Sequence, residues 1–248
     1  MVLILASSYN CNEKDENGVR HPIPLADTNS FLSNIKKFIP KYDSIVYVAN
    51  DPDNFEVINE WANIVFTSFE LTGLKFKNRI ILDSRNKNNA RSIVENADLV
   101  MLAGGKINCQ LDFFSEIGLK ELIEKHKGLV IGGSAGSMNL CKTVFNFPEE
   151  PCDIDGRKDN DFFQPGLGFF DRIIIPHFND TEYYQCNAGV DSWNEYIRPL
   201  SHGREFLAYD DDSYILINNG KIEYFGTFYK IKDGKIHIID KKTVSCHS

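Results

Sequence analysis

The chain has no cluster of basic residues and no long apolar run. Its nearest approach to a basic cluster is Lys241-Lys242, and its formal net charge at pH 7 is −8. Because phosphate binding needs clustered Lys and Arg, we do not expect a nucleic-acid partner. No segment approaches the ~20 consecutive apolar residues that span a membrane. The apolar start, Met1 to Ser8, lacks a basic segment and a cleavage site, so we predict a buried strand and not a signal peptide.

The cysteines form neither a CxxC pair nor a zinc-binding pattern with histidine. They are Cys11, Cys109, Cys141, Cys152, Cys186 and Cys246. Scattered cysteines favour free thiols in a reducing compartment, so we expect a cytoplasmic protein. Four acids between 153 and 161 differ in spacing from an EF-hand loop, and a solvated loop is expected there. Those acids are Asp153, Asp155, Asp159 and Asp161. We therefore expect neither a metal nor a cofactor.

Short apolar runs alternate with longer amphipathic stretches in the first half of the chain. This alternation is typical of parallel strands joined by helices that cover both faces of the sheet. The predicted strands are Val2–Ala6, Ile45–Val48, Ile80–Leu82, Leu99–Leu102 and Leu129–Ile131. The fold class is therefore α/β, with three layers (α/β/α) and a mainly parallel sheet. A length of 248 residues with 42% apolar content suits one domain over residues 1–248.

The second half of the chain has a different pattern. Residues 143–168 lose the periodicity and are predicted to form a long loop. A strand at Ile173–Ile175 and a helix over 183–196 should follow. The dipeptides Asn219-Gly220 and Asp233-Gly234 stand between apolar runs, which predicts two tight hairpins. We expect the antiparallel strands of these hairpins to extend the C-terminal edge of the sheet.

The strongest chemical signal is Gly132-Gly133-Ser134-Ala135-Gly136, which fits the pattern G-x-S-x-G between a predicted strand and a predicted helix. A serine on such a turn is strained, and small neighbours are needed where other side chains would clash with the adjacent backbone. The turn lifts the hydroxyl above the sheet, beside the amides that open the following helix. We predict that Ser134 is a nucleophile; a Gly-rich turn that only connects or binds phosphate is the alternative.

A serine nucleophile needs a general base and an acid that orients the base. His177 alone among the histidines follows an apolar strand, whose carboxyl end should lie at the same sheet edge as Ser134. The other five histidines occupy loops, a helix end, a hairpin or the chain end: His21, His126, His202, His237 and His247. The acid is expected within Asp210-Asp211-Asp212, which ends the apolar strand Phe206–Tyr209.

The chain resembles the peptidase E family of serine peptidases, which includes cyanophycinases, in four segments that occur in the family's order. These segments are Ala103-Gly104-Gly105, the 132–136 turn, Pro176-His177-Phe178 and the Ala-Tyr-Asp-Asp-Asp-Ser stretch at 208–213. The resemblance covers nearly the whole chain, and the combination is specific where G-x-S-x-G alone is not. It implies a fold similar to class I glutamine amidotransferases and the activity of a serine-type exopeptidase or dipeptidase.

The resemblance also implies roles for single residues. It places the triad on Ser134, His177 and Asp211, where the family usually has Glu as the acid. Because Asp is one methylene shorter, Asp210 stays open as the acid. The family's oxyanion hole corresponds to the backbone amides of Gly105 and Ala135. The mechanism implied is acyl transfer through an acyl-enzyme, without metal or cofactor.

The expected partner is a small peptide substrate, with no nucleic acid or membrane, and the chain is either a monomer or a homodimer. The resemblance implies aspartyl dipeptides, whose side chain needs a cation. The stretch that matches the family's arginine-bearing helix, 187–195, contains no Arg, and the nearest are Arg198 and Arg204. The acids at Asn179-Asp180-Thr181-Glu182 favour instead a site for the free amino group of a peptide.

Three other functions are compatible with parts of this pattern. An esterase of the α/β-hydrolase type orders its triad Ser, acid, His, and would have to use His237. A glutamine amidotransferase has Cys at the position of Ser134, which disfavours that class. A non-enzymatic binding or sensor protein on this scaffold would be favoured if His177 and Asp211 lay too far apart for a hydrogen bond.

Overall fold

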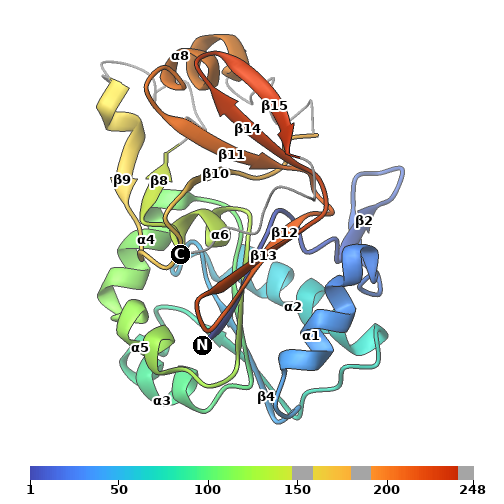
Figure 1. The fold of residues 1–248 in the computed structure, drawn as a ribbon. Coiled ribbons are helices and arrows are strands. Elements are labelled where there is room, and N and C mark those ends of the chain that lie inside the picture. Colours follow the sequence, from blue (N-terminus) through green and yellow to red (C-terminus); the bar gives the residue numbers. More distant parts are fainter. Residues whose placement is uncertain (147–158, 180–190, 240–248) are drawn as a thin grey trace.

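The apolar runs of the first half form the parallel centre of a seven-stranded sheet in the computed structural model, which describes residues 1–146, 159–179 and 191–239 (Figure 1). In spatial order the strands are β13 (Lys221–Phe225), β12 (Tyr214–Asn218), β1 (Val2–Ala6), β7 (Leu129–Gly133), β6 (Leu99–Leu102), β4 (Ser44–Val48) and β5 (Asn78–Leu82). In this spatial order, each strand in the series β1, β7, β6, β4 and β5 is parallel to the next. Strands β12 and β13 add an antiparallel edge beside β1. The predicted α/β fold class is confirmed.

Helices cover both faces of this sheet, because successive side chains of a strand point to opposite faces. Leu3 and Leu5 of β1 belong to the core beneath one set of helices, and Ile4 and Ala6 to the core beneath the other. The first set is α3 (Ala90–Glu95), α4 (Ile107–Glu116) and α5 (Leu119–Lys125). The second set is α1 (Phe31–Phe38) and α2 (Phe55–Leu71). Figure 1 shows the sheet edge-on between these two layers.

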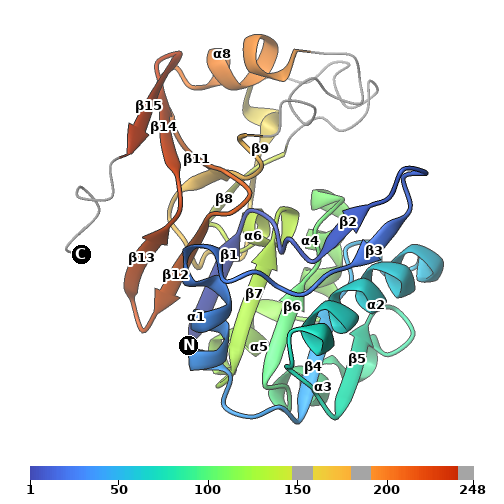
Figure 2. The same ribbon diagram turned by 90° about the vertical axis from the view of Figure 1, so that its right-hand side faces the viewer.

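A second sheet lies beyond the carboxyl ends of the central strands (Figures 1 and 2). It contains β10 (Ile173–Ile175), β11 (Glu205–Tyr209), β14 (Phe228–Lys232) and β15 (Lys235–Ile239), in that order. The expectation that the strand before His177 shares the sheet of Ser134 is therefore wrong, and only the first C-terminal hairpin extends the central sheet. Phe206, Leu207 and Ala208 of β11 join the core on the α4 side, so the second sheet buries its own apolar face there.

Both predicted hairpins form. Asn219 and Gly220 have φ of 49° and 84° between β12 and β13, and Asp233 and Gly234 have φ of 50° and 72° between β14 and β15. Two consecutive positive φ values are the geometry of a type I′ turn, which favours Asn-Gly and Asp-Gly. The turn chemistry therefore predicts these connections, although it does not say which sheet each hairpin joins.

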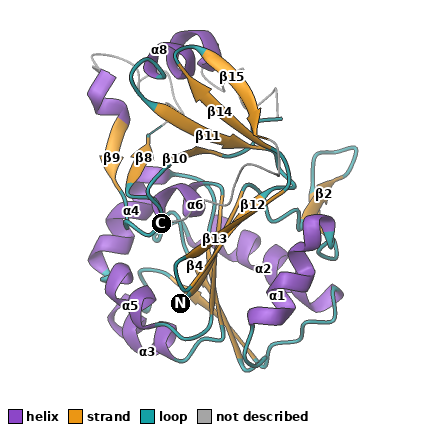
Figure 3. Cartoon of the chain, viewed as in Figure 1, coloured by secondary structure: helices purple, strands orange, loops and turns teal. Residues whose placement is uncertain are grey.

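Other expectations have mixed outcomes. The segment predicted as a loop, 143–168, contains the antiparallel pair β8 (Thr143–Phe145) and β9 (Phe163–Pro165), and residues 147–158 lie outside the described structure. Most of the helix predicted over 183–196 also lies outside it; a π-helix covers Trp193–Ile197, followed by α8 (Arg198–Leu200). A further hairpin, β2 (Asn12–Lys14) and β3 (Arg20–Pro22), contacts α2 (Figure 3).

Within the described residues, no helix has the length and apolar content needed to cross a membrane. The single domain predicted over residues 1–248 stays a prediction.

Candidate active site

Ser134 stands on a sharp turn between β7 and α6 (Ala135–Asn139). Its backbone has φ 50° and ψ −116°, a conformation that L residues rarely adopt. The Ser134 N–H donates to the carbonyls of Ala6 and Ser7, at 3.1 Å each, which ties the turn to the end of β1. A strained backbone persists only where its surroundings fix it, and such strain is concentrated at functional sites.

The glycines that flank this turn are required by close backbone contacts. A Cβ on Gly132 would lie 2.7 Å from the backbone of Gly136, and a Cβ on Gly136 would lie 2.4 Å from the carbonyl oxygen of Leu102. The pattern G-x-S-x-G therefore reflects the packing of α6 against the strand ends. The prediction of a strand-to-helix turn around Ser134 matches the structure.

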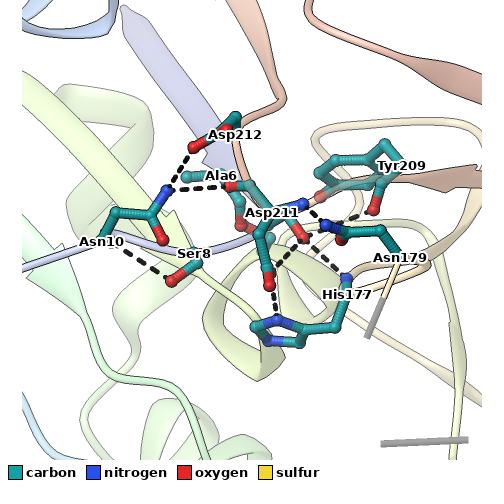
Figure 4. Close-up of polar contacts among 10 residues, drawn as sticks. Ala6, Ser8, Asn10, His177, Asn179, Tyr209, Asp211 and Asp212 are labelled. Carbon is teal, nitrogen blue, oxygen red and sulfur yellow. Dashed lines mark hydrogen bonds and ion pairs between the residues drawn. The ribbon is translucent and has the colours of Figure 1, made fainter. Parts of the chain in front are cut away.

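His177 contacts Asp211 through its Nδ1 and the carboxylate Oδ1 (Figure 4). Both side chains are mostly buried, at 19% and 30% exposure. His177 follows β10, and Asp211 follows β11, its parallel neighbour. His177 has a φ of 58°, so it too is held in a strained backbone conformation. The structure thus brings together two of the predicted site residues as a hydrogen-bonded pair.

Ser7 links this pair to the turn of Ser134. Its side chain is fully buried, and its Oγ accepts a 2.7 Å hydrogen bond from the backbone N–H of His177. The same hydroxyl lies 3.4 Å from both Asp211 Oδ1 and the carbonyl of Tyr209, and can donate to one of them at a time. The Ser7 carbonyl accepts from the N–H of Ser134. One residue at the end of β1 therefore touches all three predicted triad positions.

The other acids of the 210–212 run have different partners. Asp210 accepts a 3.1 Å hydrogen bond from Tyr229 Oη, while its Oδ1 is buried and has no partner in the described structure. Burial raises the pKa of Asp210. The Asp212 carboxylate accepts from Asn10 Nδ2 at 2.9 Å (Figure 4). Asp211, and not Asp210, is therefore the acid that contacts His177.

Asp211 is also fixed through its backbone. Its N–H donates to Asn179 Oδ1 at 2.9 Å, and its carbonyl accepts from Asn10 Nδ2 at 3.3 Å (Figure 4). The first bond joins the loop after β11 to the loop of His177, and the second joins it to the segment after β1.

The two predicted oxyanion donors lie near Ser134. Gly105 follows β6 with φ 115°, and a Cβ there would meet the Asn50 side chain at 2.2 Å. A Cβ on the neighbouring Gly104 would lie 3.3 Å from the Cβ of Ser134, which places this loop beside the turn. The N–H groups of Gly105 and Ala135 make no hydrogen bond to other described residues.

Ser134, His177 and the Gly104-Gly105 loop line one pocket of about 270 Å³. It is lined by Ser7, Ser8, Tyr9, Cys11, Asn12, Tyr47, Asn50, Val57, Trp61, Val65, Gly104, Gly105, Gly133, Ser134 and His177. Ser134 and His177 therefore face the same cavity, together with the Gly104-Gly105 loop. Pockets for drug-sized ligands measure roughly 300–1,000 Å³, so this cavity suits a ligand of about dipeptide size.

The histidine that an alternative triad would use lies elsewhere. His237, which an esterase triad would require, is on β15 at the outer edge of the second sheet, where it pairs with Lys230. Cys11, Cys109 and Cys141 are free thiols, and the remaining cysteines lie outside the described residues. Among the described residues, no group of three or more His, Cys, Asp or Glu side chains could hold a metal ion; Asp153 and Asp155 lie outside them.

Ser7 and Tyr9 were not predicted as site residues. Tyr9 packs its ring on Gly133 and donates its hydroxyl to the carbonyl of Leu102, at the end of β6. A signal for both was present, because they follow β1 at the same carboxyl edge that carries Ser134. The pocket residues on α2, Val57, Trp61 and Val65, had no signal of their own, since apolar residues at helical spacing indicate a helix face packed on the core.

The fold is that of known peptidases. A crystal structure of a peptidase from an acI-B1 Actinobacterium matches with a TM-score of 0.66 and 16% identity, over 96% of this chain and 93% of that one. A protein assigned as peptidase E from Listeria monocytogenes EGD-e matches with a TM-score of 0.56 and 16% identity, over 90% of this chain and 96% of that one. At such identity these structures show the fold alone.

The chain belongs to peptidase family S51, whose family model matches residues 26–225. The family expected from the sequence is thereby confirmed, and with it the class of the protein, a peptidase. No curated protein matches the sequence.

Proposed function

We propose that this chain is a serine peptidase that hydrolyses small peptides, with Ser134 as the nucleophile, His177 as the general base and Asp211 as the acid that orients it. The observation that carries the proposal is the contact between His177 Nδ1 and Asp211, in a histidine that lines the same pocket as Ser134. This contact leaves Nε2 as the ring nitrogen that can exchange a proton with the serine.

The proposed reaction has two halves. Ser134 Oγ attacks the carbonyl carbon of the peptide bond while His177 takes its proton, and the negative oxygen is held by the N–H groups of Gly105 and Ala135. His177 then gives the proton to the leaving amine as the C–N bond breaks, which leaves an ester on Ser134. Water attacks this ester with His177 again as the base, and the acid product leaves as Ser134 regains its proton.

The electrostatic contributions follow from the positions of these groups. Asp211 stabilises the positive imidazolium form of His177, which exists only while a proton is in transit. Each N–H donor aimed at the developing oxyanion contributes about 3–4 kcal/mol to transition-state stabilisation in acyl-transfer enzymes. Two such donors, with no partner in the described structure, supply a large part of the rate enhancement that the proposal requires.

The substrate is proposed to be short, because the pocket of about 270 Å³ holds little more than a dipeptide. Aspartyl dipeptides are one class to test, since the family resemblance implies them. The arginines considered from the sequence do not support them: neither Arg198 nor Arg204 lines the pocket, and Arg204 stacks on the Phe163 ring at 4.4 Å.

The test is active-site labelling with a fluorophosphonate, followed by a dipeptide hydrolysis screen. Ser134→Ala is compared with Ser8→Ala, a matched control because Ser8 lines the same pocket. We expect labelling in the wild type and in Ser8→Ala, hydrolysis in the wild type, and neither labelling nor hydrolysis in Ser134→Ala. Equal hydrolysis by Ser134→Ala, or no labelling of the folded wild type, would contradict the proposal.

A further inference from the structure

The pocket continues from Ser134 to the side chains of β4 and α2. Tyr47 comes from β4, and Val57, Trp61 and Val65 come from three successive turns of α2. Tyr9 and Cys11 complete the apolar part of the wall. None of these residues belongs to the proposed triad or oxyanion hole, so they form a separate part of the site.

The strand order fixes how far this wall lies from the nucleophile. Strand β4 is two positions from β7, with β6 between them. Neighbouring strands lie about 4.8 Å apart, so the end of β4 is about 10 Å from the turn of Ser134. A residue whose carbonyl carbon is bound at Ser134 would therefore extend its side chain across the Gly104-Gly105 loop toward Tyr47 and Trp61.

The wall carries no charge that would bind an ionic side chain. None of the described residues that line the pocket is Asp, Glu, Lys or Arg. Burial raises the pKa of the Cys11 thiol and of the Tyr47 phenol, so both stay neutral at pH 7. The polar groups that remain are neutral hydroxyls and amides, such as those of Ser8, Asn12 and Asn50.

Two cations lie close to lining residues, and each has another partner. The guanidinium of Arg20, on β3, stacks on the Trp61 ring at 4.9 Å from its centroid. Lys106, next to Gly105 in the sequence, forms a 3.0 Å ion pair with Asp51. Neither side chain lines the pocket. The segment after His177, residues 180–190, contains no Lys or Arg.

We propose that this pocket selects a neutral apolar or aromatic side chain on the residue whose carbonyl is attacked, and excludes aspartate at that position. The inference rests on the proposed function, because it assumes that Ser134 is the nucleophile. An apolar side chain gains contact with Tyr47, Val57, Trp61 and Val65, whereas a carboxylate would lose its water without gaining a cation.

The first experiment measures kcat/KM for a dipeptide series X-Ala in which X is Asp, Asn, Ala, Leu or Phe. We expect Leu or Phe to exceed Asp by at least about 100-fold, with Asn and Ala between them. Comparing Asn with Asp isolates the charge, and comparing Leu with Asn isolates the apolar contact. A preference for Asp over both Asn and Leu would overturn the proposal.

Variants of Val57 test the charge argument without removing core packing, because this side chain is 41% exposed on α2. Val57→Lys should lower kcat/KM for X = Leu about 10-fold or more and raise it for X = Asp. Val57→Gln is the matched control, similar in length and uncharged, and should not gain activity on X = Asp. Failure of Val57→Lys to change the Asp-to-Leu ratio would contradict the placement of this wall.

Arg20→Gln tests whether the cation that stacks on Trp61 binds the substrate carboxylate. If the guanidinium stays on Trp61, the Asp-to-Leu ratio stays the same in this variant. If wild type prefers Asp and Arg20→Gln loses that preference, Arg20 is the carboxylate-binding group and the proposal is wrong.

Fluorophosphonate labelling of Ser134 in every preparation separates the two hypotheses. A labelled enzyme that prefers Asp keeps the proposed serine mechanism and overturns only the specificity. A folded enzyme that is neither labelled nor active overturns the proposed function itself.

Discussion

Replacing Ser7 by Ala should impair catalysis although Ser7 does not react. The substitution removes the hydroxyl that accepts from the His177 N–H at 2.7 Å and that lies 3.4 Å from Asp211 Oδ1. Ser7 is fully buried, so water does not replace the lost acceptor freely. The backbone of His177, strained at φ 58°, then loses one of the contacts that hold it.

The size of the effect follows from the unpaired N–H. A buried donor left without an acceptor costs about 1–3 kcal/mol. If that cost appears as loss of the correct His177 orientation, kcat falls about 5- to 150-fold, since 1.36 kcal/mol corresponds to a factor of ten. If it appears as stability, the melting temperature of a chain of this size falls by roughly 2–4 °C per kcal/mol.

Steady-state kinetics and thermal unfolding of Ser7→Ala, beside Ser68→Ala, separate these effects. Ser68 lies on α2, is also fully buried and does not line the pocket. Its hydroxyl donates to the carbonyl of Ile23 at 2.5 Å. We expect both variants to melt earlier and only Ser7→Ala to lose kcat, with a smaller change in KM. An unchanged kcat in Ser7→Ala, or equal losses in the two variants, would refute the positioning role.

Three further predictions concern neighbouring residues. Asp211→Asn should lower kcat/KM by up to about 10⁴-fold in dipeptide hydrolysis, because the amide cannot support a charged His177; a loss below 10-fold would contradict the proposed acid. Burial raises the pKa of Asp210 above 3.8, so the folded state holds this proton more tightly and loses stability as the pH rises through that shifted pKa. Asp210→Asn should therefore have a higher melting temperature than wild type at pH 7, the same melting temperature at pH 3, and unchanged activity. A lower melting temperature at pH 7 would contradict this. Gly133→Ala places a Cβ 2.5 Å from the Tyr9 ring and should cost about 1–3 kcal/mol of stability, measured by urea unfolding, with loss of activity; wild-type stability would show that the ring moves freely.

Much of this architecture could be predicted from the sequence where the signal is local. The Asn219-Gly220 turn specifies a hairpin because both residues adopt positive φ. The 132–136 turn specifies a strand-to-helix corner because its glycines allow backbones to approach to distances that a Cβ would block. His177 could be selected because it follows an apolar strand. The strand before the acid narrowed the choice only to Asp210-Asp211-Asp212, and Asp211 was chosen within that run by the family resemblance.

What the sequence did not indicate is which sheet each strand joins. Ile173–Ile175 is an apolar run like those of the central sheet, yet it pairs with Phe206–Ala208 in a second sheet. An apolar run shows that a strand is buried and says nothing about its neighbour, which depends on packing between distant segments. For the same reason Trp61 could not be assigned to the site, since its role exists only once α2 lies beside the strand ends. The position of Ser7 after β1 was visible in the sequence, but its contacts with His177 and Asp211 were not.

The division into two sheets explains how the site can be both assembled and fixed. The proposed nucleophile belongs to the central sheet, and the His177–Asp211 pair belongs to the second one, where β10 and β11 run parallel with Ile175 opposite Ala208. The geometry between nucleophile and base therefore depends on how the sheets pack, and not on the register of either sheet alone. Ser7 lies where the sheets meet: its carbonyl holds Ser134, and its hydroxyl holds His177. A fully buried residue that joins both halves makes the alignment a property of the folded core, which explains why a loop histidine can be held in a strained conformation there.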